Sequence, residues 1–212
     1  MGQVIAVMGE SGSGKTTAMR NLDPATTYYI DADMKGLSWK GWKSQYSKEA
    51  KNYIQIDDPK VAIGFLGNIN DKAPKIKTVV IDTLNGLMVA EEMRRSKEKG
   101  FDKWTDIASY VWDLVQNALK CRDDLNVIFL CHSQTDRDDN GNIWTRIKTS
   151  GRKLDKIVLE SKFTTVLLCR SEGDKHYFET TANYSTAKSP FGALPPVMDN
   201  DIVPVLKALE EY

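Results

Sequence analysis

Residues 4–19 read VIAVMGESGSGKTTAM, an apolar run followed by a segment with three glycines, one lysine and two threonines. From Gly9 to Thr16 the segment fits G-x-x-x-x-G-K-[ST], in which the N–H groups of a glycine-rich turn surround a phosphate. In such a loop Lys15 reaches the β- and γ-phosphates, and the Thr16 hydroxyl is a Mg²⁺ ligand. A flexible turn between a strand and a helix is the simpler interpretation, but it does not explain the spacing. We therefore predict an ATP-binding loop made of Gly9, Glu10, Ser11, Gly12, Ser13, Gly14, Lys15, Thr16 and Thr17.

Short apolar runs alternate with longer helical patterns along the rest of the chain. We expect strands at residues 3–8, 27–31, 53–56, 77–81, 126–131, 164–169 and 176–180. We expect helices at residues 15–22, 59–69, 105–120 and 201–211. This alternation predicts an α/β fold, a three-layer sandwich with a mainly parallel central sheet. The length predicts one domain over residues 1–212, with a core of about 3–182 and a C-terminal segment that wraps the surface.

The composition limits the classes of partner and of compartment. The formal net charge is zero, so a nucleic-acid site would have to be a local basic patch. Cys121, Cys131 and Cys169 share no metal-ligand spacing, which favours a reducing cytoplasm. The apolar run at residues 4–8 is short and follows no basic segment, so we expect neither a signal peptide nor a membrane span.

A second anchor for Mg²⁺ is expected at the end of a buried strand. The segment KTVVIDTLNGL places Asp82 directly after the strand predicted at residues 77–81, at the edge where open α/β sheets bind ligands. Asp82 could instead cap the following helix, a role that Thr83 would fill equally well. We favour Asp82 as a metal-binding residue.

A catalytic carboxylate is not found beside Asp82, because the next residue is Thr83 and not an acid. The segment TYYIDADMKGL instead ends a strand with Asp31 and Asp33. A carboxylate at this strand end can hold a water in line with the γ-phosphate. The competing interpretation is a solvated turn that carries two acids.

These segments, together with VIFLCHSQ at residues 127–134, resemble the ATP-binding core of the RecA-like P-loop ATPases. The resemblance implies that Asp33 occupies the position of the catalytic glutamate, with a side chain one methylene shorter. It also implies that His132 or Gln134 senses the γ-phosphate and relays it to DNA-binding loops. The alternative for His132 is a hydrogen-bonded histidine at a strand end.

The segments SGRKLDKIVLESKFTTVLLC and TANYSTAKSPFG look most like a compact phage branch, the Sak-type single-strand DNA annealing and recombination ATPases. This resemblance implies an oligomeric ATPase that acts on single-stranded DNA in the host cytoplasm, alongside a single-strand DNA-binding protein. The phosphate loop begins at residue 9, so we expect the ring or filament to form through core surfaces. A cation from a neighbouring subunit would stabilise the γ-phosphate, with Lys188 the first candidate and Arg170 the second.

Residues 144–156 form a basic segment after an Asn-Gly hairpin-turn signal at residues 140–141. One aromatic and several cations suit single-stranded DNA, because a base stacks on the ring and the cations follow the phosphates. A solvated basic face is the simpler interpretation, but in the resembling family loops here line the pore or filament axis. The candidate DNA-binding residues are Trp144, Arg146, Lys148, Arg152, Lys153 and Lys156.

Two other functions remain open. A small-molecule kinase with a phosphate loop has a similar length, and residues 134–156 would then be its lid. A nucleotide-gated scaffold without hydrolysis is the third candidate, because the Asp33 side chain is short. The expected cofactors are ATP and Mg²⁺.

Overall fold

The computed structural model describes residues 2–100, 102–137, 141–149 and 158–211. Within these residues nine strands form one sheet, in the order β3-β2-β4-β5-β1-β7-β8-β9 with β6 paired to β5. The strands are β1 (Val4–Gly9), β2 (Thr27–Asp31), β3 (Tyr53–Gln55), β4 (Thr78–Asp82), β5 (Asn126–Arg137), β6 (Ile143–Ile147), β7 (Thr165–Glu172), β8 (Lys175–Glu179) and β9 (Val197–Asp199). The strands from β3 to β7 in this order are parallel, whereas β6, β8 and β9 pair antiparallel with their neighbours.

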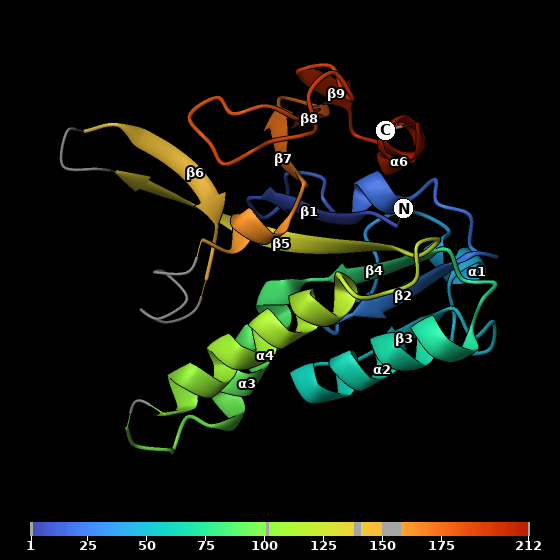
Figure 1. Ribbon diagram of the computed structural model, residues 1–212, viewed down its shortest axis with the longest axis vertical. Coiled ribbons are helices and arrows are strands. Elements are labelled where there is room, and N and C mark those ends of the chain that lie inside the picture. The colour runs from blue at the N-terminus through green and yellow to red at the C-terminus, as the bar shows by residue number, and fades with distance from the viewer. Residues whose placement is uncertain (1, 101, 138–140, 150–157, 212) are drawn as a thin grey trace.

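Helices cover both faces of the sheet, as Figure 1 shows. On one face lie α2 (Pro59–Lys72), α3 (Leu84–Arg94) and α4 (Asp102–Ala118). On the other lie α6 (Ile202–Glu210), α1 (Trp42–Gln45) and the 3₁₀ turn η1 (Thr17–Met19). A second 3₁₀ turn, η2 (Leu159–Lys162), precedes β7. The predicted three-layer α/β sandwich with a mainly parallel sheet is confirmed.

The continuous apolar runs of the central strands are buried on both faces. In β4, Val79 and Ile81 pack toward α2, α3 and α4, while Val80 packs toward η1 and α6. Successive side chains of a strand point to opposite faces, so each run contributes to two cores. This burial explains why these strands do not alternate between apolar and polar residues.

The predicted helix at residues 15–22 is wrong, because this segment forms only the turn η1. Ala18 N donates to Gly14 O over four residues, but Met19 N and Arg20 N donate over three, to Thr16 O and Thr17 O. The segment lies between the glycine-rich loop and a turn at Asp23, whose carboxylate accepts from Ala25 N. Because these bonds span three residues, the segment is a single short 3₁₀ turn, and η1 contributes only a small dipole to a phosphate site.

The predicted strand at residues 126–131 is too short, because β5 continues to Arg137 and forms a hairpin with β6. Gly141 has φ 83°, as the Asn-Gly turn signal predicts, while residue 140 lies outside the described residues. The short elements α1, β6 and β9 and the bounds of α3 were not predicted. They depend on tertiary contacts that leave little periodic pattern in the chain.

Candidate functional site

The carboxyl ends of β1, β2, β4 and β5 bring the predicted site residues to one edge of the sheet. Asp31 lies opposite Asp82 in the β2–β4 pair, and Gly9 lies opposite His132 in the β1–β5 pair. The strand β5 separates β1 from β4. Even so, Thr16 in the loop after β1 reaches across to β4, where its Oγ1 donates to Asp82 Oδ2 over 2.7 Å.

The glycines of the phosphate loop serve two different purposes. Gly12 and Gly14 have φ 81° and 99°, a left-handed conformation that other residues adopt at a cost. Gly9 has no room for a side chain, since a Cβ there would lie 2.5 Å from Ser13 Oγ and 2.7 Å from Cys169 O. Residues of β7 and β8 also contact the loop: Ser13 O accepts from Cys169 Sγ and lies 3.0 Å from His176 Nδ1. The predicted ATP-binding residues therefore form a preorganised turn.

Lys15 is buried at the base of this loop. Its Nζ donates to Gly9 O over 2.9 Å and to Glu10 O over 2.7 Å. Burial lowers the pKa of the Lys15 ammonium from its ordinary value, while the nearby Asp82 carboxylate acts in the opposite direction. The ammonium is thus held inside the turn that would surround a phosphate.

Asp82 is a buried carboxylate, with 1% of its surface exposed. Its Oδ2 accepts from Thr16 Oγ1 and from Tyr29 OH, each over 2.7 Å. Its Oδ1 is buried without a hydrogen-bond partner among the described residues. Burial raises the pKa of Asp82, and the hydrogen bonds from Thr16 and Tyr29 counteract that rise. An unpaired buried carboxylate oxygen carries a high energetic cost unless a cation neutralises it.

These residues fit a magnesium ion. The Thr16 hydroxyl and the Asp82 carboxylate supply the oxygen ligands that Mg²⁺ prefers, and Mg²⁺ in nucleotide sites needs only one or two protein ligands. Asp82 is not the cap of α3, since Thr83 Oγ1 accepts from Gly86 N at the start of that helix. The alternative role considered for Asp82 therefore belongs to Thr83.

Asp33 lies beside this buried group but is more open. Its Oδ1 accepts from Thr83 Oγ1 over 2.8 Å, and its Oδ2 lies 2.6 Å from Lys35 Nζ. Burial by itself raises the pKa of Asp33, but the hydrogen bonds from Lys35 and Thr83 outweigh it and leave the pKa below its ordinary value. Asp33 is therefore ionised at neutral pH, as a water-binding base requires.

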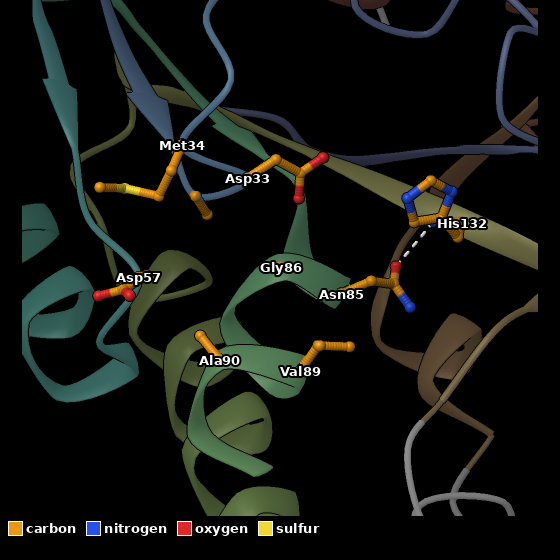
Figure 2. A pocket seen from close by; sticks show the side chains of 9 residues that line it. Asp33, Met34, Asp57, Asn85, Gly86, Val89, Ala90 and His132 are labelled. Carbon is orange, nitrogen blue, oxygen red and sulfur yellow. Dashed lines mark hydrogen bonds between the residues drawn. The ribbon is translucent and has the colours of Figure 1, made fainter. Parts of the chain in front are cut away.

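His132 and Gln134 have different surroundings. His132 N donates to Asn85 Oδ1 over 2.7 Å, and His132 and Asp33 both line the pocket drawn in Figure 2. Burial, followed by the charge of Lys15, lowers the pKa of His132, so the ring is neutral at pH 7. Gln134 Nε2 instead contacts the carboxylate of Asp136 on the hairpin, at 3.2 and 3.3 Å.

A cavity of about 210 Å³ opens over the phosphate loop. Besides loop residues it is lined by Thr83 and His132, and by three residues that the sequence did not single out: Lys35, Ser38 and His176. Lys35 stands two positions beyond Asp33 and was recognisable as a cation near the catalytic acid. His176 had no such signal, because only the β7–β8 hairpin brings it to the loop. Among the described residues that line this cavity, neither Lys188 nor Arg170 appears.

The predicted DNA-binding residues divide into three groups. Trp144 is 50% exposed, and Lys148 is also exposed. Arg146 forms an ion pair with Asp136 across the β5–β6 hairpin. The remaining three lie outside the described residues: Arg152, Lys153 and Lys156.

The predicted trans-acting cations lie near β7. Lys188 pairs through its backbone with Val166, and Arg170 Nε lies 3.5 Å from Glu179 Oε2. Either side chain would act on another subunit.

Comparisons with known proteins add the family. In the part of the chain that the structure describes, no helix combines the length and the apolar character needed to cross a membrane. No curated protein matches the sequence. A family model described as an AAA domain matches residues 1–191. With the phosphate loop, the Thr16–Asp82 contact and the parallel sheet, this match shows that the chain belongs to the AAA-domain family of P-loop ATPase-like proteins.

Proposed function

We propose that this protein is a Mg-ATP-dependent ATPase of the compact Sak-type branch. It binds single-stranded DNA as a ring or filament and acts in phage DNA recombination or annealing in the host cytoplasm, with a single-strand DNA-binding protein as partner. The observation that carries the ATPase part is the hydrogen bond from Thr16 to Asp82 next to the phosphate loop, together with the buried Asp82 Oδ1, which has no partner in the described part of the chain.

In the proposed hydrolysis, each group of residues at the site has a separate role. The loop N–H groups and Lys15 bind the phosphates, and Thr16 and Asp82 hold Mg²⁺. When bound, Mg²⁺ neutralises charge on the β- and γ-phosphates. Asp33 orients a water and accepts its proton while the water oxygen bonds to the γ-phosphorus. The bond from that phosphorus to the bridging oxygen breaks, so the products are ADP and inorganic phosphate.

The DNA-binding part is supported by the direction of side chains on the β5–β6 hairpin, which projects from the body of the molecule (Figure 1). Gln134 lies opposite Arg146, and Asp136 lies opposite Trp144. Opposed residues of an antiparallel pair point to the same face. The aromatic ring of Trp144 and the guanidinium of Arg146 therefore share the face that carries the candidate sensor Gln134.

Asn85 connects this hairpin to the nucleotide cavity. Its Oδ1 accepts from His132 N over 2.7 Å, and its Nδ2 donates to Lys148 O over 2.8 Å. Lys148 N in turn donates to His132 O over 2.8 Å. A shift of His132 upon ATP binding would thus be transmitted to Lys148, just before the rest of the basic segment.

One observation favours the kinase alternative. A second cavity of about 340 Å³ is lined by Asp33 together with Met34, Asp57, Val89 and His132 among others (Figure 2). An acceptor molecule bound there would lie next to the carboxylate that the ATPase mechanism assigns to water.

Phosphate release should be measured with and without a single-stranded oligonucleotide, and with a panel of nucleoside monophosphates. DNA-stimulated release without a phosphorylated acceptor supports the ATPase, whereas a phosphorylated monophosphate supports the kinase.

Trp144→Ala should weaken oligonucleotide binding about tenfold, the loss of one base stacked on an aromatic ring. Phe191→Ala, at an exposed aromatic far along the chain from the hairpin, is the matched control. Equal binding by the two variants would remove Trp144 from the DNA site.

The mass in solution tests the oligomer. With a non-hydrolysable ATP analogue and an oligonucleotide, we expect a mass several times that of the 23.9 kDa chain. A monomer under all conditions would contradict the ring or filament.

A further inference from the structure

A second lysine faces the cavity over the phosphate loop. Lys35 lines this cavity together with Lys15, Thr16 and Thr83, although it comes from the loop after β2 and not from the phosphate loop. Its Nζ lies 2.6 Å from Asp33 Oδ2, and its side chain is 52% exposed. The cavity is thus flanked by two ammonium groups from one chain.

The turn that presents Lys35 is built from residues 31–36. Asp31 Oδ2 accepts from Gly36 N and from Tyr53 OH, each over 2.7 Å. Met34 and Gly36 have φ 60° and 82°, so the backbone reverses on both sides of Lys35. Met34 consequently lines the second cavity while Lys35 lines the first.

The ion pair with Asp33 adds little to the fold, because Lys35 is half exposed and exposed pairs are weak. The position of Lys35 matters more for the electrostatics of the cavity than for the stability of the fold. The neighbouring acids Asp33, Asp82 and Asp31 attract this ammonium. A triphosphate in the cavity would carry more negative charge than the single carboxylate of Asp33, and lysine binds phosphates as a compact point charge.

We propose that Lys35 is a phosphate-binding cation that moves between Asp33 and the terminal phosphate of ATP. Without nucleotide, the Lys35 ammonium forms an ion pair with Asp33 Oδ2. With ATP bound, the ammonium moves to the γ-phosphate, and the freed oxygen of Asp33 holds the attacking water. Lys35 takes no proton in this step, and it supplies within one chain a charge otherwise expected from Lys188 or Arg170 of a neighbour. The inference rests on the proposed ATP hydrolysis and adds a γ-phosphate-dependent control to it.

The test compares Lys35→Met with Lys40→Met, which removes an exposed lysine of the same segment that does not line the cavity. Dissociation constants for ADP and for a non-hydrolysable ATP analogue are measured with Mg²⁺, together with the melting temperature. Lys35→Met should weaken binding of the ATP analogue about tenfold, the value of one charge-assisted hydrogen bond, with ADP binding unchanged within about twofold. Lys35→Arg should restore most of the difference, and Lys40→Met should match the wild type.

A purely structural role for Lys35 would weaken ADP and the ATP analogue equally, and that result would overturn the inference. So would equal affinities in Lys35→Met and the wild type. Either result leaves the proposed ATPase intact, provided that the wild type binds and hydrolyses ATP. If the wild type binds neither nucleotide, the proposed function fails and the inference fails with it.

Discussion

The two halves of the nucleotide site differ in how tightly the protein holds them. Around Asp82 the carboxylate is buried, and Thr16 and Tyr29 both donate to one of its oxygens. Around Asp33 the partners are Thr83 and the half-exposed Lys35, and a second cavity adjoins the carboxylate. The groups of the buried half are held in place by hydrogen bonds within the protein, and groups that are ordered in advance lower the cost of binding. The open half, with its half-exposed Lys35, is where the proposed exchange of this lysine between Asp33 and the γ-phosphate would take place.

The largest effect is expected from Asp33→Ala, which changes the open half and leaves the buried half intact. Asp33→Ala removes the group that orients the water, so turnover should fall by about 10²- to 10⁴-fold while ATP remains bound. Single-turnover hydrolysis and equilibrium ATP binding measure the two quantities. Unchanged turnover would instead favour the scaffold without hydrolysis.

Lys15→Ala should act on the buried half. The ammonium inside the loop is lost, so binding of ATP and of ADP should both fall by about 10- to 100-fold. Fluorescence titration with each nucleotide measures this loss, and Lys40→Ala is the control. A Lys15→Ala variant that binds ATP normally would contradict the proposed site.

Gly86→Ala should disturb the open half through packing. A Cβ at Gly86 would lie 2.4 Å from Asp33 Oδ1 and 2.8 Å from Ala32 O, so the carboxylate must move. Turnover should fall about tenfold, because small displacements of a catalytic group are costly, while ATP binding persists. Gly64→Ala in α2 is the control, since a Cβ there meets nothing within 4 Å. Equal turnover in these two variants would show that Asp33 tolerates displacement.

Tyr29→Phe should have the smallest effect, confined to the buried half. It removes one hydrogen bond to Asp82 and leaves that from Thr16, so the free energy of unfolding should fall by about 1 kcal/mol. The Mg²⁺ concentration for half-maximal ATP hydrolysis should rise a few-fold, because Asp82 is less firmly oriented. Denaturant unfolding and a Mg²⁺ titration measure these changes. A loss of turnover as large as in Asp33→Ala would contradict the division between the halves.

The buried half was predictable because its residues follow local rules. A glycine-rich loop after one strand and an aspartate after another both appear as short contiguous patterns. Parallel strands end at the same edge, so these patterns predict that Thr16 and Asp82 meet. The open half was predicted only in part. Asp33 was recognised, but its contacts with Lys35 and Thr83 were not, because they depend on the backbone of a turn with Met34 at φ 60°.

The helix predicted after the phosphate loop shows another limit. The phosphate-loop motif and Pro24 suit a helix at residues 15–22, but in the structure this segment forms only η1, between the loop and the turn at Asp23. The local sequence gives only a preference for a helix, and the tertiary structure can override that preference in a short segment.

The sequence alone therefore determined the α/β fold, the phosphate loop and the aspartate that faces it, because strand periodicity and loop motifs are properties of neighbouring residues. Only the tertiary structure decided that one oxygen of Asp82 has no hydrogen-bond partner among the described residues, that Lys35 and His132 line the cavity over the phosphate loop, and that Gln134 turns to the hairpin. These facts depend on strand register and on side chains from distant segments, and no local pattern encodes which of several nearby polar groups will meet.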